Sequence, residues 1–162
     1  MWLANALPMQ GHHRYRFVKH GGVNIKGPGY IYKDVYFDSV APHLITIGKN
    51  ATITQGTTIL THYIDPDKVG RSYRMGEVHI EEDAFIGCNT IICNSVTIGK
   101  GSIVAAGSVV SPGKVIPPNS MVMGVPGRVV RELTEQDREG TVKSVAHYIA
   151  YAEAQFEKTY ME

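Results

Sequence analysis

A six-residue period organises the middle of this chain. Each step of six lands on Ile or Val, and the eight positions are Ile80, Ile86, Ile92, Ile98, Val104, Val110, Ile116 and Val122. Because Ile and Val fill about a fifth of the sequence, eight independent hits have a chance probability on the order of one in several hundred thousand. This repeat constrains the fold more strongly than any other feature of the chain.

A period of six is neither the helical period of 3.6 nor a simple alternation of two. One hexad fits a short strand and a tight corner, so three hexads predict one triangular coil of a parallel β-helix. Stacked coils would align residues 18 apart in internal ladders of Ile and Val, which bury a core that one hexad could not bury alone. The composition agrees, because 15 Ile and 17 Val against 5 Leu favour strands over a helical bundle.

The same spacing occurs upstream at Ile47, Ile53 and Ile59, but Ile59 and Ile80 are 21 residues apart, which is not a multiple of six. Residues 63–79 show no hexad and contain Pro, Gly and many charged residues, so we predict a loop that leaves the solenoid there. Residues 22–46 are expected to form irregular early coils. The predicted β-helix domain therefore spans residues 1–133.

The end of the chain has a helical pattern. Thr134, followed by Asp137, resembles an N-terminal capping box. The apolar spacing beyond it predicts an amphipathic helix over residues 135–159. We expect the unit of residues 134–162 to cover an open end of the solenoid, because an uncovered edge invites association.

Bulk properties exclude several classes. The net charge of +1 predicts no strong basic field for nucleic acid or anionic lipid, and no apolar run approaches a membrane span of about 18 residues. Residues 1–10 lack a basic start and a small-residue cleavage site, so they are not expected to act as a signal peptide. With only Cys88 and Cys93, a reducing cytoplasm is the simpler expectation.

Three motifs occur together between Val78 and Leu133. They are the Ile-Gly hexads, the Ala-Gly-Ser-Val-Val run at 106–110, and Pro-Pro-Asn followed by Gly-Val-Pro-Gly-Arg at 124–128. Over residues 44–133 the chain resembles the hexapeptide-repeat acyltransferases, especially the galactoside, maltose and polysaccharide O-acetyltransferases. The resemblance implies a left-handed β-helix, a homotrimer, and an acyl-CoA site in the groove between neighbouring subunits.

The resemblance also singles out His62 in Thr-His-Tyr-Ile-Asp-Pro. The family has Thr-His-Pro with a following Asp-Pro, and that histidine is its catalytic base; here Tyr63 replaces the proline. A sugar hydroxyl is a poor nucleophile at neutral pH, and histidine readily accepts a proton there. The resemblance therefore implies that His62 activates an acceptor hydroxyl for direct attack on acetyl-CoA, with a backbone N–H near Cys88 stabilising the oxyanion.

Coenzyme contacts carry over by position. Ala106 and Ser111 match residues that hold the pantetheine chain, Cys88 matches a residue lining the thioester, and Phe85 matches an aromatic at the tunnel mouth. Basic positions near the coenzyme phosphates are matched by Lys114, Arg128 and Arg131. The segment Ser111–Pro117 is about two residues longer than its family counterpart, so the placement of Lys114 is left open.

The acceptor is predicted to be a sugar or glycan precursor, lined by residues 27–38 and the loop 63–79. Tyr36 offers an apolar face to a sugar ring, and Asp38 or Asp65 could hydrogen-bond its hydroxyls. An amine or serine acceptor stays open, although the N-terminal helical domain typical of serine acetyltransferases does not occur in this sequence.

Two other readings compete with an acetyltransferase. The gamma-class carbonic anhydrases share this solenoid, and Cys88, Cys93 and His62 could be drawn as a Cys₂His zinc site. A solenoid without catalysis, acting as a binding module, is the other alternative. The preferred interpretation expects no metal and no nucleic-acid partner.

Overall fold

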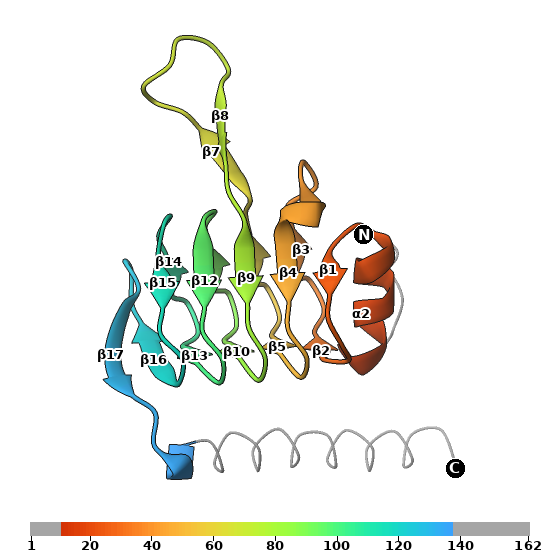
Figure 1. The fold of residues 1–162 in the computed structure, drawn as a ribbon, viewed down its shortest axis with the longest axis vertical. Helices are drawn as coiled ribbons and strands as arrows, with labels where there is room; N and C mark the ends of the chain where they lie inside the picture. The colour runs from red at the N-terminus through yellow and green to blue at the C-terminus, as the bar shows by residue number, and fades with distance from the viewer. Residues whose placement is uncertain (1–10, 138–162) are drawn as a thin grey trace. The chain divides into compact units, whose positions relative to one another are not determined.

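The computed structural model describes residues 11–137, and residues up to 132 form a triangular solenoid (Figure 1). Each of its four full coils places one short strand in each of three sheets. Coil 1 comprises β1–β3, coil 2 β4–β6, coil 3 β9–β11 and coil 4 β12–β14. The predicted parallel β-helix is confirmed.

The sheets contain strands of two to five residues. Sheet A is ordered β1 (Asn24–Ile25), β4 (Ile45–Ile47), β9 (Val78–Ile80), β12 (Val96–Ile98) and β15 (Val115–Ile116). Sheet B is ordered β2 (Tyr30–Ile31), β5 (Thr52–Ile53), β10 (Phe85–Ile86), β13 (Ile103–Val104), β16 (Ser120–Met123) and β17 (Arg128–Glu132). Sheet C is ordered β3 (Tyr36–Phe37), β6 (Thr58–Ile59), β11 (Ile91–Ile92) and β14 (Val109–Val110).

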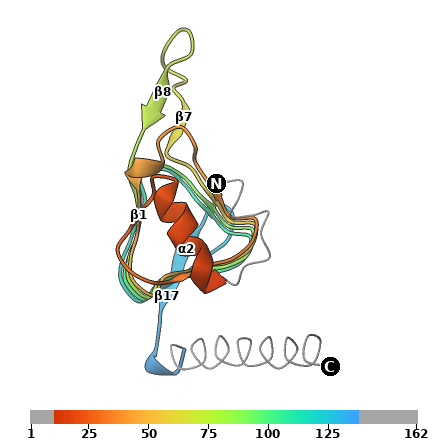
Figure 2. The same ribbon diagram turned by 90° about the vertical axis from the view of Figure 1, so that its right-hand side faces the viewer.

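The coils wind to the left. Figure 2 views the solenoid from its N-terminal end, and the chain passes from sheet A on the left to sheet B below and sheet C on the right as it recedes. A receding counterclockwise path is a left-handed helix. This is the handedness that the family resemblance implied, against the usual right-handed rule for parallel crossovers.

The hexad residues stack as predicted and form the core. Ile80 pairs in register with Ile98 and then Ile116, Ile86 with Val104 and Val122, and Ile92 with Val110. Each of the eight ladder side chains is at most 4% exposed. Stacking like upon like along each sheet therefore removes a continuous apolar column from water.

Tight corners explain why small residues follow the ladder positions. A Cβ added to Gly87 would lie 2.4 Å from the backbone nitrogen of Ala106, and one on Gly99 would lie 2.5 Å from that of Pro118. Neighbouring coils pass so close at these corners that any side chain would push the backbones apart.

The ladders extend further towards the N-terminus than the sequence suggested. Residues 22–46 were expected to be irregular, but Ile25, Ile31 and Phe37 pair with Ile47, Ile53 and Ile59. The partners are 22 residues apart because extra residues at 38–44, including a short 3-10 helix, η1 (Pro42–Leu44), enlarge one corner. That enlargement hid the regular coil.

The upstream ladder is also in phase with the main one in space. Ile47, Ile53 and Ile59 pair with Ile80, Ile86 and Ile92, 33 residues apart rather than 18. The 15 extra residues leave the solenoid as a hairpin of β7 (His62–Ile64) and antiparallel β8 (Tyr73–Met75). The predicted protruding loop is thus an ordered hairpin (Figure 1).

Both enlargements lie at the turn from sheet C to sheet A, which we call the C-to-A corner. At the N-terminal end, α2 (Gly11–His20) lies across coil 1. At the other end, β17 turns back antiparallel to β16. Within residues 11–137, none of the helices has the length and apolarity needed to cross a membrane.

The second unit of the chain spans residues 133–162, of which 133–137 are described. The backbone N–H of Thr134 donates to the Asp137 carboxylate at 2.8 Å, and the Asp137 N–H donates back to the Thr134 hydroxyl at 3.3 Å. The capping box is confirmed. The rest of the helix predicted over 135–159 lies outside the described residues.

Candidate active site

The C-to-A corner brings Asp38 and His62 together from coils 1 and 2. Phe37 pairs with Ile59, and the N–H of Asp38 donates to the carbonyl of Ile59 at 2.9 Å. This register places the residue after β3 beside the chain that leads from β6 into β7. His62 is the first residue of β7, so it stands where the hairpin leaves the solenoid.

Asp38 holds His62 through a short hydrogen bond. Nδ1 of His62 lies 2.5 Å from Oδ2 of Asp38. The same oxygen accepts from the N–H and the hydroxyl of Thr61, each at 2.8 Å, and Oδ1 accepts from the N–H of Val40 at 3.0 Å. The Asp38 side chain is fully buried, whereas that of His62 is 23% exposed.

The surroundings of Asp38 keep it ionised. Burial alone would raise the pKa of this carboxyl, but hydrogen bonds from Thr61, Val40 and His62 together lower it below the ordinary value. An ionised carboxylate only accepts hydrogen bonds, so Nδ1 of His62 must carry the proton. In the neutral ring the lone pair of His62 is then on Nε2, and the side chain as a whole is 23% exposed.

Asp38 was predicted to contact the acceptor directly, and the structure corrects this. Its side chain has no exposed surface, and its oxygens are occupied by protein donors. The contact between Asp38 and His62 was not predicted from the sequence. The signal was the Ile25, Ile31 and Phe37 hexad, which, once aligned with Ile59, places Asp38 at the corner of His62.

Asp65 requires a similar correction. Its carboxylate is buried where β7 leads into the loop of the hairpin, and it pairs with Arg74 at 2.9 Å. The Arg74 guanidinium lowers the pKa of Asp65, and Asp65 in turn raises that of Arg74. Arg74 also bonds to Asp67 and lies over the ring of Tyr63, so Asp65 braces the hairpin and is not presented to an acceptor.

The two faces of the hairpin differ. Tyr63 and Arg74 are cross-strand partners on the polar face. His62 shares the other face with Ile64, Tyr73 and Met75, which are 60%, 47% and 45% exposed. The ring of Tyr73 meets that of His62 edge-on, with centroids 5.1 Å apart. A row of exposed, mostly apolar side chains therefore stands beside the ring of His62.

Two residues predicted to bind coenzyme share the C-to-A corner with His62. Cys93 N–H donates to Val110, the residue before Ser111, which places Ser111 on coil 4 at this corner, and Lys114 ends the same turn. Ser111 is half-buried and Lys114 is exposed. The corner therefore carries, in stacking order, Asp38, His62 and Ser111.

The other predicted coenzyme residues lie elsewhere on the solenoid. Cys88 and Ala106 are exposed and stacked at the opposite end of sheet C, where Gly107 N–H donates to the Cys88 carbonyl at 2.8 Å. Phe85 is half-buried in β10 of sheet B. Arg128 and Arg131 are exposed on β17. One chain thus presents these residues beside sheet C, in sheet B and on β17, not in one pocket.

Tyr36, the remaining predicted acceptor contact, is 49% exposed on the outer face of sheet C, two residues before Asp38.

The structure does not support the alternative Cys₂His zinc site of Cys88, Cys93 and His62. Cys88 and Cys93 are at opposite ends of β11, and no group of three metal-ligating side chains gathers anywhere in residues 11–137.

Comparisons with known proteins agree with this architecture. The family described as "Bacterial transferase hexapeptide (six repeats)" matches residues 77–112. The galactoside O-acetyltransferase of Lactococcus lactis subsp. lactis is 33% identical over 125 residues, covering 75% of this chain and 59% of that protein. The chain spans between about a third and three fifths of the length of the curated relatives it matches.

Solved structures share the fold over most of the chain. The hexapeptide-repeat-containing acetyltransferase VCA0836 of Vibrio cholerae is 29% identical with a TM-score of 0.64, covering 83% of this chain and 86% of that one. A galactoside acetyltransferase in complex with coenzyme A is 26% identical with a TM-score of 0.57, covering 85% and 78%. With the hexad ladders, these matches show that the chain is similar in sequence and in fold to the hexapeptide-repeat acetyltransferases.

Proposed function

We propose that this protein transfers an acetyl group from acetyl-CoA to a hydroxyl of a sugar or glycan precursor. The observation that carries the proposal is the Asp38–His62 pair, which holds the ring proton on Nδ1 and leaves the lone pair on Nε2 of a partly exposed histidine side chain. The galactoside O-acetyltransferase relative supports a sugar acceptor, and the coenzyme A complex of a similar structure supports the donor.

His62 acts as the general base. Nε2 takes the proton of the acceptor hydroxyl while its oxygen attacks the thioester carbonyl carbon, forming a tetrahedral oxyanion. The oxyanion collapses, the carbon–sulfur bond breaks, and the protonated His62 returns the proton to the departing thiolate. The products are the acetyl ester and free coenzyme A, and no acyl-enzyme is needed.

Asp38 acts through His62 as a positioning residue. Its carboxylate keeps the Nδ1 proton in place, so that Nε2 is always the basic nitrogen. It also stabilises the imidazolium that forms when Nε2 takes the proton. Because Thr61 and Val40 fix the carboxylate, the ring is held before substrate arrives and little reorganisation accompanies the reaction.

The acceptor would lie against the apolar face of the hairpin. Tyr73 and Met75 offer flat, exposed surfaces beside His62, and a sugar ring carries apolar C–H faces that stack on such surfaces. Tyr36 is a further candidate on sheet C. This placement takes over the role that the sequence analysis gave to Asp38 and Asp65.

The coenzyme would follow the outer side of sheet C. Ser111, Ala106 and Cys88 would contact the pantetheine chain and thioester, with a backbone N–H near Cys88 facing the oxyanion and Phe85 near the entrance. Lys114, Arg128 and Arg131 would meet the phosphates. These residues are spread along one chain, so a homotrimer, in which a neighbouring copy closes the groove, is part of the proposal.

The decisive experiment measures release of free coenzyme A thiol with a panel of sugar, serine and amine acceptors. We expect His62→Ala to lower kcat by about 10²–10⁴ and to leave the KM for acetyl-CoA nearly unchanged. His79→Ala, which removes a half-exposed histidine of sheet A paired with Glu77, is the matched control and should keep full activity.

Two outcomes would contradict the proposal. Full activity of His62→Ala would remove the general-base role. A protein that acetyl-CoA stabilises against heat, but that releases no thiol with any acceptor, would instead be a binding module, because a ligand that binds only the folded state raises stability.

A further inference from the structure

The near-zero net charge of this chain conceals a strong separation of charge. Residues 1–33 contain no Asp or Glu and five basic residues, whereas the rest of the chain holds the other 11 Lys and Arg and all 15 Asp and Glu. The five are Arg14, Arg16, Lys19, Lys26 and Lys33. Residues 1–33 are therefore basic and the remainder is acidic overall, beginning with Asp34, an exposed carboxylate between β2 and β3 of coil 1.

The structure gathers this charge at one end of the solenoid. α2 lies across coil 1 with Arg16 and Lys19 exposed, and Lys26 is exposed just after β1. None of these three forms an ion pair with a carboxylate of residues 11–137. Arg14 is not part of this exposed basic surface, because its side chain is buried. It also interacts electrostatically with Asp34.

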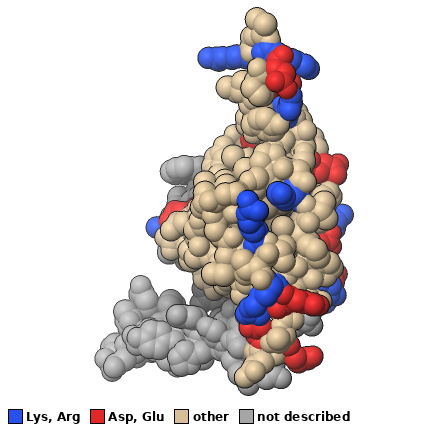
Figure 3. All heavy atoms as spheres, turned by 90° about the vertical axis from the view of Figure 1, so that its left-hand side faces the viewer, with Lys and Arg blue, Asp and Glu red and all other residues tan. Residues whose placement is uncertain are grey.

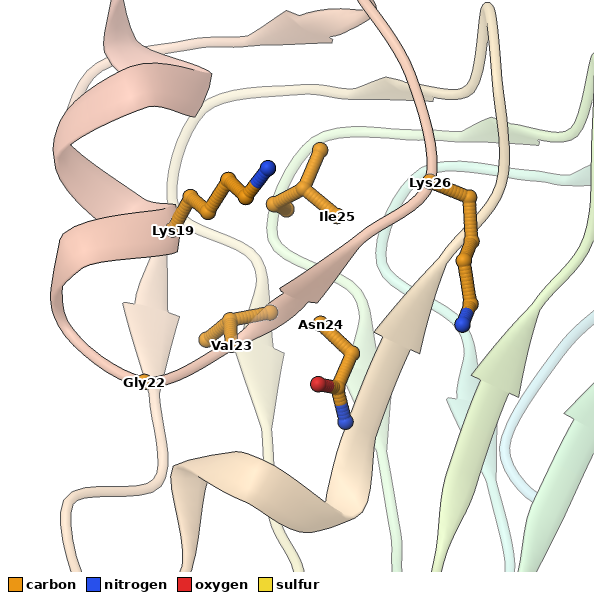
Figure 4. Close-up of a pocket in the computed structure, with 6 residues that line it drawn as sticks. All are labelled: Lys19, Gly22, Val23, Asn24, Ile25 and Lys26. Carbon is orange, nitrogen blue, oxygen red and sulfur yellow. The ribbon is translucent and has the colours of Figure 1, made fainter.

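A surface hollow lies between the helix and the first strand. Both Lys19 and Lys26 line it, and Figure 4 shows Lys19 extending from the end of α2 toward Ile25, with Lys26 on the far side of Ile25 after β1. Its lining contains no acidic side chain and comprises Lys19, Gly22, Val23, Asn24, Ile25 and Lys26. Cations thus continue from the helix onto the first coil.

The helix α2 that carries two of these cations also exposes an aromatic ring. Phe17 is 40% exposed and lies between Arg16 and Lys19 in sequence. The opposite end of the molecule differs, because Figure 3 shows Lys and Arg there interspersed with Asp and Glu. The basic end is therefore a particular feature of the N-terminal coil and not a general property of the surface.

We propose that this basic end docks on a membrane surface of anionic lipid headgroups. Arg16, Lys19 and Lys26 would meet the headgroup phosphates and carboxylates, and Phe17 would enter the boundary between headgroups and acyl chains. The occupant is a lipid surface and not a nucleic acid, because a phosphate backbone gives an exposed Phe nothing apolar to contact. α2 is also only about 15 Å long, too short to follow a duplex over many phosphates.

Binding should depend on charge in a calculable way. Each Lys or Arg near an anionic membrane contributes about a fivefold increase in partitioning. Arg16→Gln with Lys19→Gln should therefore lower partitioning about 25-fold. Phe17→Ala should lower it several-fold on vesicles and leave any residual binding to DNA unchanged.

The experiment is sedimentation of the full chain with vesicles of phosphatidylcholine alone or with phosphatidylserine added. We expect binding only with phosphatidylserine, and release as salt shortens the screening length. The matched control is Lys68→Gln with Arg71→Gln, which removes two exposed charges from the hairpin tip. It should bind like the wild type.

Equal losses in the two double variants would overturn the proposal, because net charge alone would then explain the binding. Equal binding to both kinds of vesicle would also overturn it. So would duplex DNA binding as tight as vesicle binding, combined with no effect of Phe17→Ala. Acetyl transfer is not involved in any readout, so the result is independent of the proposed function.

Discussion

Replacing Asp38 with Asn tests whether the buried carboxylate controls His62. The substitution keeps the size of the side chain but removes its charge and exchanges one acceptor oxygen for an NH₂ donor. Oδ2 accepts three hydrogen bonds and Oδ1 accepts one. Either orientation of the Asn amide therefore sets a donor against a protein donor.

The expected loss can be worked from this contact. A hydrogen bond to a charged group contributes about 1.5–3 kcal/mol, which corresponds to about 10–150-fold in rate. If the amide instead donates to Nδ1, His62 carries its proton on Nε2 and cannot act as a base. We therefore expect kcat to fall by about 10²–10⁴, the whole range of general-base catalysis, with little change in the KM for acetyl-CoA.

The assay is thiol release under saturating substrates, alongside urea unfolding to show that the variant is folded. Asp34→Asn is the control, because Asp34 is an exposed carboxylate of the same coil at a positive φ of 60° that Asn tolerates. It should stay within about twofold of wild type. A folded Asp38→Asn enzyme that keeps a third or more of kcat would refute the argument.

Three further predictions concern the charge of Asp38, the buried ladder and the phosphate contact of Arg128. Because the pKa of Asp38 is lowered in the folded protein, it contributes stability above its ordinary pKa that is lost as pH falls through the folded value; urea unfolding at a series of acidic pH values should show a steeper decline for wild type than for Asp38→Asn. Ile92→Ala should cost about 2–5 kcal/mol of unfolding free energy, because Ile92 is fully buried, whereas Ile91→Ala, on the same strand but 38% exposed, should cost far less; equal losses would contradict the ladder core. Arg128→Gln should raise the KM for acetyl-CoA several-fold but not that for acetyl-pantetheine, which has no nucleotide phosphates, and an equal effect on both donors would remove the phosphate contact.

The six-residue repeat could be recognised from the sequence because its residues keep a constant spacing along the chain. Ile or Val every six residues has one simple structural solution, and the eight ladder residues from Ile80 to Val122 are all buried as predicted. The capping box at Thr134 is equally local, and its reciprocal hydrogen bonds form.

Coil 1 was not recognised as a regular coil from the sequence. Ile25, Ile31 and Phe37 have the same spacing, but they were not recognised because the next hexad begins after an enlarged corner. A period detects only residues that keep phase along the chain. Strand pairing keeps phase in space, and it tolerates 15 extra residues at one corner without disturbing the ladder.

The sequence by itself determined the solenoid, its core and the position of His62 at the break in the repeat. These follow from side-chain patterns within a few residues. Only the tertiary structure decided what surrounds that histidine. Asp38 is 24 residues away in the chain, and its carboxylate reaches Nδ1 only because coils 1 and 2 stack in register. Residues that are brought together only by the stacking of coils leave no local pattern in the sequence. Asp38 was therefore predicted to contact the substrate, whereas in the folded protein it is buried and holds His62 in place.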